Sequence, residues 1–404
     1  MLTPYDEYPV HQAPQPFSYI PSTDYSWDEG YWFAVFNPEE KVFLGIGARV
    51  NPNTDMFGGY AMINVDGVQR TVRFSRTWRS NFELDLGPLH IRFPEPMKKI
   101  ALTLDDNESG IAFDLLWEGT SAAYQEDRQT VVHRGRRTTD QTRYSQAGRV
   151  HGSLSVGKRS WALDPEKWVG GRDHSWGLYV ERAPLAPPAH LLPPRLAPKG
   201  KPRALRVWTC FRTGPVSGFF HIHEDANGEQ GQLDDPFGAP FGGVFNVPGR
   251  DEVLHLASGS HRITYREETR IATHAVMDLT DEEGGAWQLE LTPVAMPWMP
   301  ATLGYTPGSW KDGGTFHTYH GSEELATEWD EFDFREQPVA HMPYNLADPN
   351  APDNFGLGFN FAKPIIGIEY LTRAVLRAPD GTAHEGGAHF EHYVNGAYRP
   401  YGFE

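Results

Sequence analysis

Short apolar runs separated by turn-forming residues recur along the whole chain. The clearest pair, at 60–65 and 69–74, encloses Asp66-Gly67, a dipeptide that favours the tight turns of antiparallel hairpins. Such runs return at intervals of about 8 to 12 residues, a spacing typical of antiparallel sandwiches and barrels. The pattern also predicts paired strands at 31–36 with 41–46, 99–103 with 111–117, 206–212 with 217–223, 275–279 with 287–291, and 370–377 with 385–391. Only residues 322–329 show helical character.

A proline-rich segment divides the chain into two parts of similar length. Residues 183–203 read APLAPPAHLLPPRLAPKGKPR, and proline cannot donate to a sheet ladder, so we predict a linker here. The length of 404 residues also favours two domains. We therefore predict an all-β fold of two antiparallel β-barrels. An N-terminal extension covers 1–25, the first barrel 26–183, the linker 184–204 and the second barrel 205–404.

Composition limits the classes of partner. The net charge of −17 argues against binding to nucleic acid or to anionic membranes, because phosphate contacts need lysine and arginine. No stretch approaches the roughly 18 apolar residues of a spanning helix, and the N-terminus lacks the basic and apolar regions of a signal peptide. We expect a cytoplasmic protein whose partner is a hydrophobic small molecule. The sequence carries no indication of oligomeric state.

The run from Gly170 to Gly177 concentrates chemically useful side chains between glycines that let a ligand or another backbone approach closely. On an extended strand Arg172, His174 and Trp176 share one face and Asp173 takes the other, unless the glycines introduce a bulge. Asp173 or His174 could donate or accept a proton in an apolar pocket. The same residues could instead form an ion pair that closes a barrel.

Three other positions carry possible chemistry. His221 and His223 share a strand face and could bind zinc with a third ligand, or lie solvated at a strand end. His389 and Glu391 also share a face, where Glu391 could be a buried acid or base, or a solvated edge residue. Cys210 lies in an apolar strand, which favours a buried and inert thiol.

The aromatic content is high, with 12 Trp, 17 Tyr and 23 Phe. Aromatic walls suit a planar or polyene ligand and can stabilise a developing cation, although barrel cores also use such residues. No dinucleotide-binding glycine motif, phosphate-binding loop, nucleophile elbow or paired-cysteine motif is present. We therefore expect acid–base chemistry with no cofactor and no metal.

The run from Gly171 to Gly177 resembles the motif of the double-lipocalin superfamily, which includes carotenoid hydratases, kievitone-hydratase-like and AttH-like proteins and fungal Diels–Alderases. The closing stretch from Gly387 to Tyr401 is also similar to bacterial members. The chain has Arg172 where the carotenoid hydratases have histidine. The resemblance implies two lipocalin-like barrels with a hydrophobic pocket in or between them, and places Asp173 and His174 at positions tied to acid catalysis. We expect substrate contacts from Arg172, Trp176, Tyr179, Trp208, His389 and Glu391.

These observations favour a cofactor-independent lyase or isomerase, of hydratase or dehydratase type, acting on a hydrophobic aromatic or isoprenoid compound. Two alternatives use the same pocket: a carbon–carbon lyase that releases formaldehyde from an aromatic compound, and a protein that only binds an apolar ligand. A metal-assisted hydrolase built on His221 and His223 is a further hypothesis.

Overall fold

The regular structure of the chain is almost entirely β. The computed structural model describes residues 2–9, 11, 14–79, 82–133, 135–179, 201, 203–231, 233, 239–298, 303–305, 309–336, 339–340, 365–366 and 368–404. Every pairing between its named strands is antiparallel. The all-β prediction is confirmed.

The first part of the chain forms one large sheet. Its path runs β19-β4-β3-β2-β1-β12-β10-β8-β7-β6-β5, with β9 and β11 also pairing with β10. The strands are β1 (Trp27–Asn37), β2 (Val42–Asn51), β3 (Met56–Val65), β4 (Val68–Thr77), β5 (Asp85–Leu86), β6 (Leu89–Glu95), β7 (Lys99–Leu104), β8 (Ile111–Gly119), β9 (Tyr124–His133), β10 (Arg136–Val156), β11 (Arg159–Leu163), β12 (Val169–Tyr179) and β19 (Ala326–Asp333).

The predicted Asp-Gly hairpin shows why these strands pair as they do. Asp66 and Gly67 join β3 to β4 with φ values of 50° and 87°, the left-handed conformation that tight hairpin turns require. The amide of Gly67 donates to the Asn64 side chain over 3.0 Å, which fixes the turn. The hairpin is therefore confirmed.

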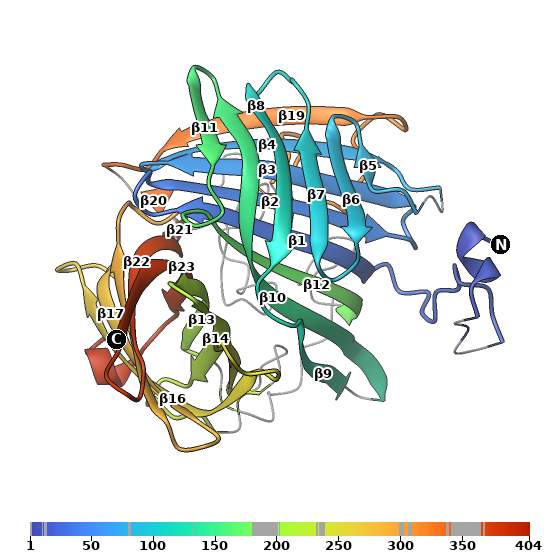
Figure 1. Cartoon of the computed structure of the whole chain (residues 1–404). Helices are drawn as coiled ribbons and strands as arrows, with labels where there is room; N and C mark the ends of the chain where they lie inside the picture. The colour runs from blue at the N-terminus through green and yellow to red at the C-terminus, as the bar shows by residue number, and fades with distance from the viewer. Residues whose placement is uncertain are drawn as a thin grey trace.

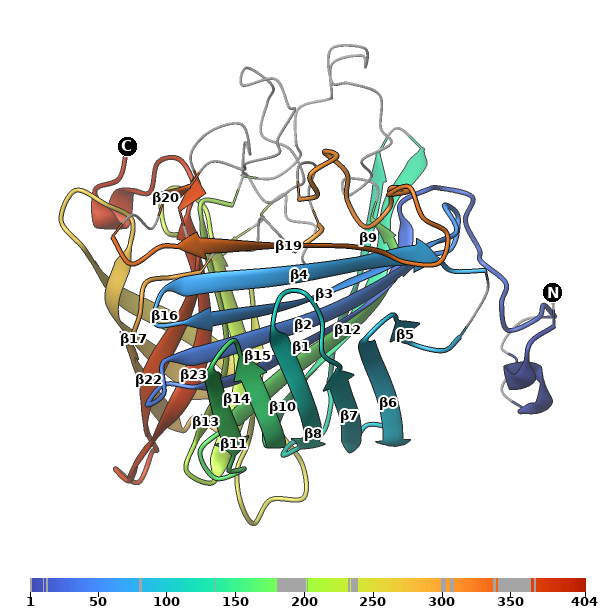
Figure 2. The same cartoon turned by 90° about the horizontal axis from the view of Figure 1, so that it is seen from above.

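The first sheet curls so that its two halves lie crosswise over one another (Figures 1 and 2). Strands β1 to β4 form one layer, and β6, β7, β8 and the upper part of β10 form the other. Apolar residues from both layers meet between them, including Phe33 and Ile46 from one and Leu102 and Trp117 from the other. We call the face that carries this core the inner face of the sheet, and the opposite face the outer face.

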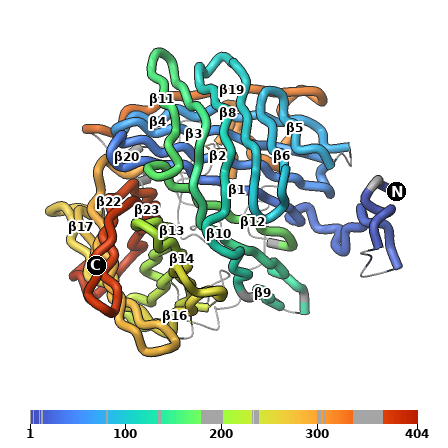
Figure 3. Tube along the Cα trace, viewed as in Figure 1, coloured from blue at the N-terminus to red at the C-terminus, as the bar shows by residue number. Residues whose placement is uncertain are grey.

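The second part is a closed eight-stranded barrel whose strands follow one another in chain order. Eight antiparallel strands in up-and-down order are the architecture of lipocalins. The barrel lies beside the outer face of the first sheet, near β10 and β12 (Figure 3). Its strands are β13 (Leu205–Thr213), β14 (Val216–Glu224), β15 (Phe241–Asn246), β16 (Leu254–Tyr265), β17 (Ala272–Asp281), β18 (Ala286–Pro293), β22 (Glu369–Arg377) and β23 (Ala383–Val394).

One segment differs from the sequence-based expectation. Residues 322–329 are predicted to be helical, but residues 322–325 lead into strand β19 and 326–329 form its first half. Strand β19 pairs with β4 of the first sheet, although it lies in the part of the sequence predicted to form the second barrel. Glu328 and Asp330, two apart on the strand, face the same side and both bind the buried guanidinium of Arg73. This long-range pairing outweighs the helix propensity of a short Glu-rich segment.

The structure describes the predicted linker and the predicted N-terminal extension only in part. Residues 184–200 and 202 of the expected linker lie outside the described residues. The N-terminal extension contains a short 3₁₀ turn (Pro4–Glu7). Tyr5 of this turn packs with Phe17 of the extension and with Phe82 of the first sheet region, and the ring centroids are 5.2 to 6.2 Å apart. Within the described part of the chain, no helix is both long enough and apolar enough to cross a membrane.

Replacing Arg73 should destabilise the protein, because it leaves two partly buried carboxylates without their shared cation. We expect Arg73→Ala to lower the free energy of unfolding by about 3 to 5 kcal/mol, measured by urea denaturation. Arg335→Ala breaks an exposed ion pair with Asp333 and serves as the matched control, with no measurable change expected. Equal effects of the two substitutions would contradict the placement of β19.

His392 should make the protein less stable in mild acid. Burial lowers the pKa of His392 to about 3 and outweighs the opposite effect of the Arg206 carbonyl, which lies 2.9 Å from Nδ1. The Tyr265 hydroxyl lies 2.8 Å from the other ring nitrogen, Nε2. The unfolded chain binds this proton near pH 6.5 but the folded chain does not, so stability falls as the pH drops below that value. Between pH 7 and pH 5 we expect His392 to account for about 2 kcal/mol of lost unfolding free energy.

The measurement is the pH dependence of urea denaturation in the wild type and in His392→Asn. The variant should show a shallower slope, whereas His255→Asn, at an exposed position, should keep the wild-type slope. A wild-type slope in His392→Asn would show that this histidine is not held neutral.

Candidate functional site

Strand β12 lies between β1 and β10 and presents the glycine-rich motif to both faces of the sheet. Its pairing with both neighbours runs without a register shift, so Gly170 and Gly171 introduce no bulge. Arg172, His174 and Trp176 therefore lie on the inner face, and Asp173 lies on the outer face. The two residues expected to act together in catalysis, Asp173 and His174, are not brought into one site.

The barrel touches the outer face of the sheet directly at Gly171. A Cβ atom at this position would lie 2.9 Å from the Cys210 Sγ, so only glycine allows the approach. Cys210 is buried in the contact, and burial raises the pKa of its thiol to about 12. The prediction of a buried Cys210 is confirmed, and the raised pKa keeps the thiol protonated at neutral pH.

Asp173 lies next to this contact and is an accessible acid on the outer face. It pairs across the sheet with Trp32 on β1 and Ser145 on β10, and its side chain is 23% exposed. One Asp173 oxygen lies 3.9 Å from the Nε of Arg143, and the Ser145 hydroxyl donates to Glu126 over 2.8 Å. Asp173 therefore lies in a polar patch at the edge of the region between sheet and barrel.

An aromatic wall runs from this patch onto the barrel. The ring of Trp32 meets Trp208 edge to face at a centroid distance of 5.7 Å, and Trp208 lies 5.0 Å from Phe219. Tyr124, from β9, continues the wall 6.4 Å beyond Phe219. Residues of the sheet and the barrel thus form one continuous aromatic cluster, in which Trp208 and Phe219 are buried. Flat rings of this kind suit contact with a planar ligand.

Behind the wall lies a buried imidazole–carboxylate pair. His389 on β23 bonds through Nε2 to a Glu369 oxygen over 2.6 Å, and its side chain is 3% exposed. Burial and the nearby charge of Glu391 raise the pKa of Glu369. Burial also opposes ionisation of Glu391, but the Arg206 guanidinium, bonded to it over 2.5 Å and 2.9 Å, more than offsets this and lowers its pKa.

The other ring nitrogen of His389, Nδ1, has no hydrogen-bond partner among the described residues. Four aromatic rings surround this imidazole at centroid distances of 4.8 to 5.9 Å, namely Trp32, Phe43, Trp208 and Trp298. A buried polar atom without a hydrogen bond costs free energy, and a catalytic role is one reason why proteins retain such atoms. Glu369 thus orients the imidazole of His389 through Nε2, while Nδ1 faces aromatic side chains.

The sequence-predicted residues are divided by the fold. Asp173, Trp208, His389 and Glu391 lie in the region between sheet and barrel, whereas Arg172, His174 and Trp176 lie on the inner face. Tyr179 ends β12, and its side chain is outside the described residues. Sequence reasoning missed Trp32, Arg143 and Glu369, which carry no local motif. The sequence offers one signal for Glu369: it directly precedes the run 370–377, which is predicted to pair with 385–391, the run that contains His389.

His221 and His223 do not form a metal site in the described structure. His221 Nε2 bonds to the Ala239 carbonyl over 2.9 Å, and His223 Nε2 lies 3.0 Å from an Arg206 nitrogen. No group of three or more possible metal ligands occurs among the described residues. These histidines belong to the polar wall of the barrel that faces the sheet.

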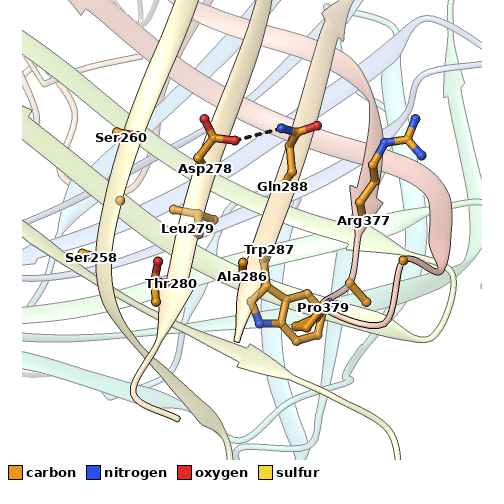
Figure 4. A pocket seen from close by; sticks show the side chains of 13 residues that line it. Ser258, Ser260, Asp278, Leu279, Thr280, Ala286, Trp287, Gln288, Arg377 and Pro379 are labelled. Atoms are coloured by element: carbon orange, nitrogen blue, oxygen red, sulfur yellow. Dashed lines mark hydrogen bonds between the residues drawn. The ribbon is translucent and has the colours of Figure 1, made fainter. Parts of the chain in front are cut away.

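A pocket of about 670 Å³ lies elsewhere, on strands β16, β17, β18 and β22 (Figure 4). Its polar side chains include Asp278 and Gln288, joined by a hydrogen bond of 2.8 Å, and Arg377. In the barrel, β17 lies far from β13, the strand that carries Trp208. This pocket contains no histidine and no sequence-predicted residue, so we place the candidate site between sheet and barrel.

Fold and site define a two-part all-β protein in which a curled sheet is packed against a lipocalin-like barrel. The chain belongs to a family of unknown function (DUF8625), whose model matches residues 2–345. Comparison with curated proteins gives no match.

Solved structures of similar arrangement include kievitone hydratase from Nectria haematococca, at 11% identity and a TM-score of 0.41, over 92% of this chain and 91% of that one. CghA alone matches at 10% identity and a TM-score of 0.45, over 92% and 90% of the two chains. CghA with Sch210972 matches at 9% and 0.44, over 92% and 89%.

The contact at Gly171 gives a test of how the barrel meets the sheet. We expect Gly171→Ala to lower the thermal midpoint, because the added methyl group overlaps Cys210 and overpacking costs about 1 to 3 kcal/mol. Gly231→Ala, where a Cβ meets open space, is the matched control and should leave the midpoint unchanged.

The cause is separated by adding Cys210→Ala. In the double variant the loss caused by Gly171→Ala should be smaller than in the wild-type background, because the overlapping sulfur is absent. Strictly additive effects would argue against direct contact.

Proposed function

We propose that the protein is a cofactor-independent lyase or isomerase of hydratase or dehydratase type. It acts on a hydrophobic aromatic or isoprenoid compound held between the sheet and the barrel. The observation that carries the proposal is His389, whose Nε2 is held by Glu369. Its Nδ1 lies among four aromatic rings and has no hydrogen-bond partner in the part of the chain that the structure describes. An imidazole fixed by a carboxylate on one side is the arrangement of a general base.

The proton chemistry follows from this geometry. The hydrogen bond from His389 opposes the effect of burial and favours the ionised form of Glu369. The Glu369 carboxylate then accepts from the Nε2–H of neutral His389, which leaves the Nδ1 lone pair free to take a proton from substrate carbon. The resulting imidazolium is stabilised by Glu369 and by the nearby charge of Glu391. For elimination, an acid must also protonate the departing hydroxyl group.

Asp173 is the acid that we assign to this second role. Trp32 links the two groups: it pairs with Asp173 in the sheet, and its ring lies 5.4 Å from that of His389. In dehydration, His389 removes a carbon-bound proton, protonated Asp173 gives its proton to the hydroxyl group, and water leaves as the double bond forms. Hydration is the same sequence in reverse, with the indole faces of Trp32 and Trp208 sheltering positive charge.

The same aromatic wall also supports a second function, binding of an apolar ligand without turnover. Trp32, Trp208 and Phe219 form this surface independently of the acid–base groups. Release of formaldehyde from an aromatic compound would need the same base. Product masses separate these alternatives.

The test is mass spectrometry of a panel of aromatic and isoprenoid alcohols and alkenes incubated with the protein. We expect loss or gain of water in the wild type, and a fall in turnover of about 10² or more in both Asp173→Asn and His389→Gln. Asp114→Asn, at an exposed position on β8, is the matched control and should retain full turnover. Unchanged thermal midpoints would show that the folded state persists.

Each outcome decides between the alternatives. Loss of formaldehyde would replace dehydration by carbon–carbon cleavage, and a new product of unchanged mass would indicate isomerisation. Bound but unconverted ligand would support the binding protein. Full turnover in both variants would contradict the assignment of Asp173 and His389.

A further inference from the structure

The inner face of β12 carries a chain of polar groups that the proposed reaction does not use. His174 Nε2 lies 2.9 Å from a Glu29 oxygen, and its Nδ1 lies 3.1 Å from the Tyr144 hydroxyl. Arg172 Nη1 donates to the same hydroxyl over 3.3 Å. Because Asp173 points to the outer face, this cluster is separated from the site between sheet and barrel by the thickness of the sheet.

Arg172 is the unusual member of the cluster, because it is a buried cation with neutral partners. It is 2% exposed, and its Nε donates to the Gln146 side-chain oxygen over 2.9 Å. Its guanidinium lies over the rings of Trp117 and Tyr144, 5.3 and 5.0 Å from their centroids. Among the described residues, no carboxylate lies within ion-pair distance of Arg172.

The remaining nitrogen, Nη2, has a weak acceptor. Its partner is the Met97 sulfur at 3.5 Å, and Met97 is 46% exposed. A thioether accepts poorly, and burying a cation without an anionic partner is costly. Burial lowers the pKa of Arg172, which is the physical signature of this imbalance. The side chain of Met97, which is exposed, thus lies between solvent and the buried guanidinium of Arg172.

The rim of the cluster is apolar and open. Trp176 is 37% exposed and lies 5.1 Å from His174, while Phe93 is 36% exposed and lies 5.9 Å from Tyr31. Tyr31 stacks on His174 at 4.1 Å. Large exposed rings beside a buried cation suit a planar ligand that carries a negative charge at one end.

We propose that the inner face of β12 binds a planar aromatic anion, such as a phenolate, whose oxygen takes the place of the Met97 sulfur at Arg172 Nη2. The Tyr144 hydroxyl lies beside the same guanidinium and can donate to the bound oxygen. The ring of the ligand packs against Trp176. This anion site is independent of the proposed reaction, because Arg172 and Asp173 lie on opposite faces of β12.

The experiment compares two probes of similar shape, 4-nitrophenolate and neutral 4-nitroanisole, by equilibrium dialysis above the pKa of the nitrophenol. The wild type should bind the phenolate more tightly by about tenfold or more, since hydrogen bonds to charged groups contribute that much. Arg172→Gln should abolish this preference. Trp176→Ala should weaken both probes while keeping the preference. Arg335→Gln, which removes an exposed cation outside both sites, is the matched control and should bind both probes as the wild type does.

Met97→Ala covers the case in which Arg172→Gln fails to fold. Removing the exposed thioether should keep or raise the affinity for the phenolate, because the oxygen no longer has to displace it. Equal affinity for the two probes in the folded wild type would overturn the proposal. A preference that persists in folded Arg172→Gln, or that disappears in Arg335→Gln, would overturn it as well.

Discussion

The direct contact between the barrel wall and the outer face of the sheet is the constraint on which the rest of the structure depends. Gly171 on the sheet allows Cys210 of the barrel to approach, and Gly387 on barrel strand β23 allows Pro38 of the β1–β2 turn to approach, 2.7 Å from where a Cβ would lie. Such close packing removes water from the polar side chains of the barrel wall. Those side chains must therefore bind one another, as Arg206 does with Glu391 and Glu369 does with His389.

Strand β12 gives this arrangement two distinct environments. Alternation along one strand sends Asp173 toward the barrel and Arg172 and His174 toward the core of the sheet. The outer environment combines a buried base with an aromatic wall and one accessible acid. The inner environment combines a buried cation with an exposed apolar rim. Adjacent residues in the sequence thus serve different chemistry because a sheet separates them.

The sequence predicts the local features well. Turn chemistry located hairpins such as the one at Asp66 and Gly67, and alternation placed Asp173 opposite His174. Tertiary partners decided the rest. The segment predicted to be helical leads into and begins strand β19 (Ala326–Asp333) because Glu328 and Asp330 meet Arg73, more than two hundred residues away. Glu369 could not be assigned either, since its role depends on the neighbouring strand that holds His389.

We propose that ligands enter between the sheet and the barrel. The most direct test is photochemical cross-linking with benzophenone, a neutral aromatic compound that attaches to whatever lies beside it. Mapping by peptide mass spectrometry should place the adducts on β1 and β13, around Trp32 and Trp208. Adducts confined to the pocket on β16, β17 and β18, with none on β1 or β13, would contradict the account.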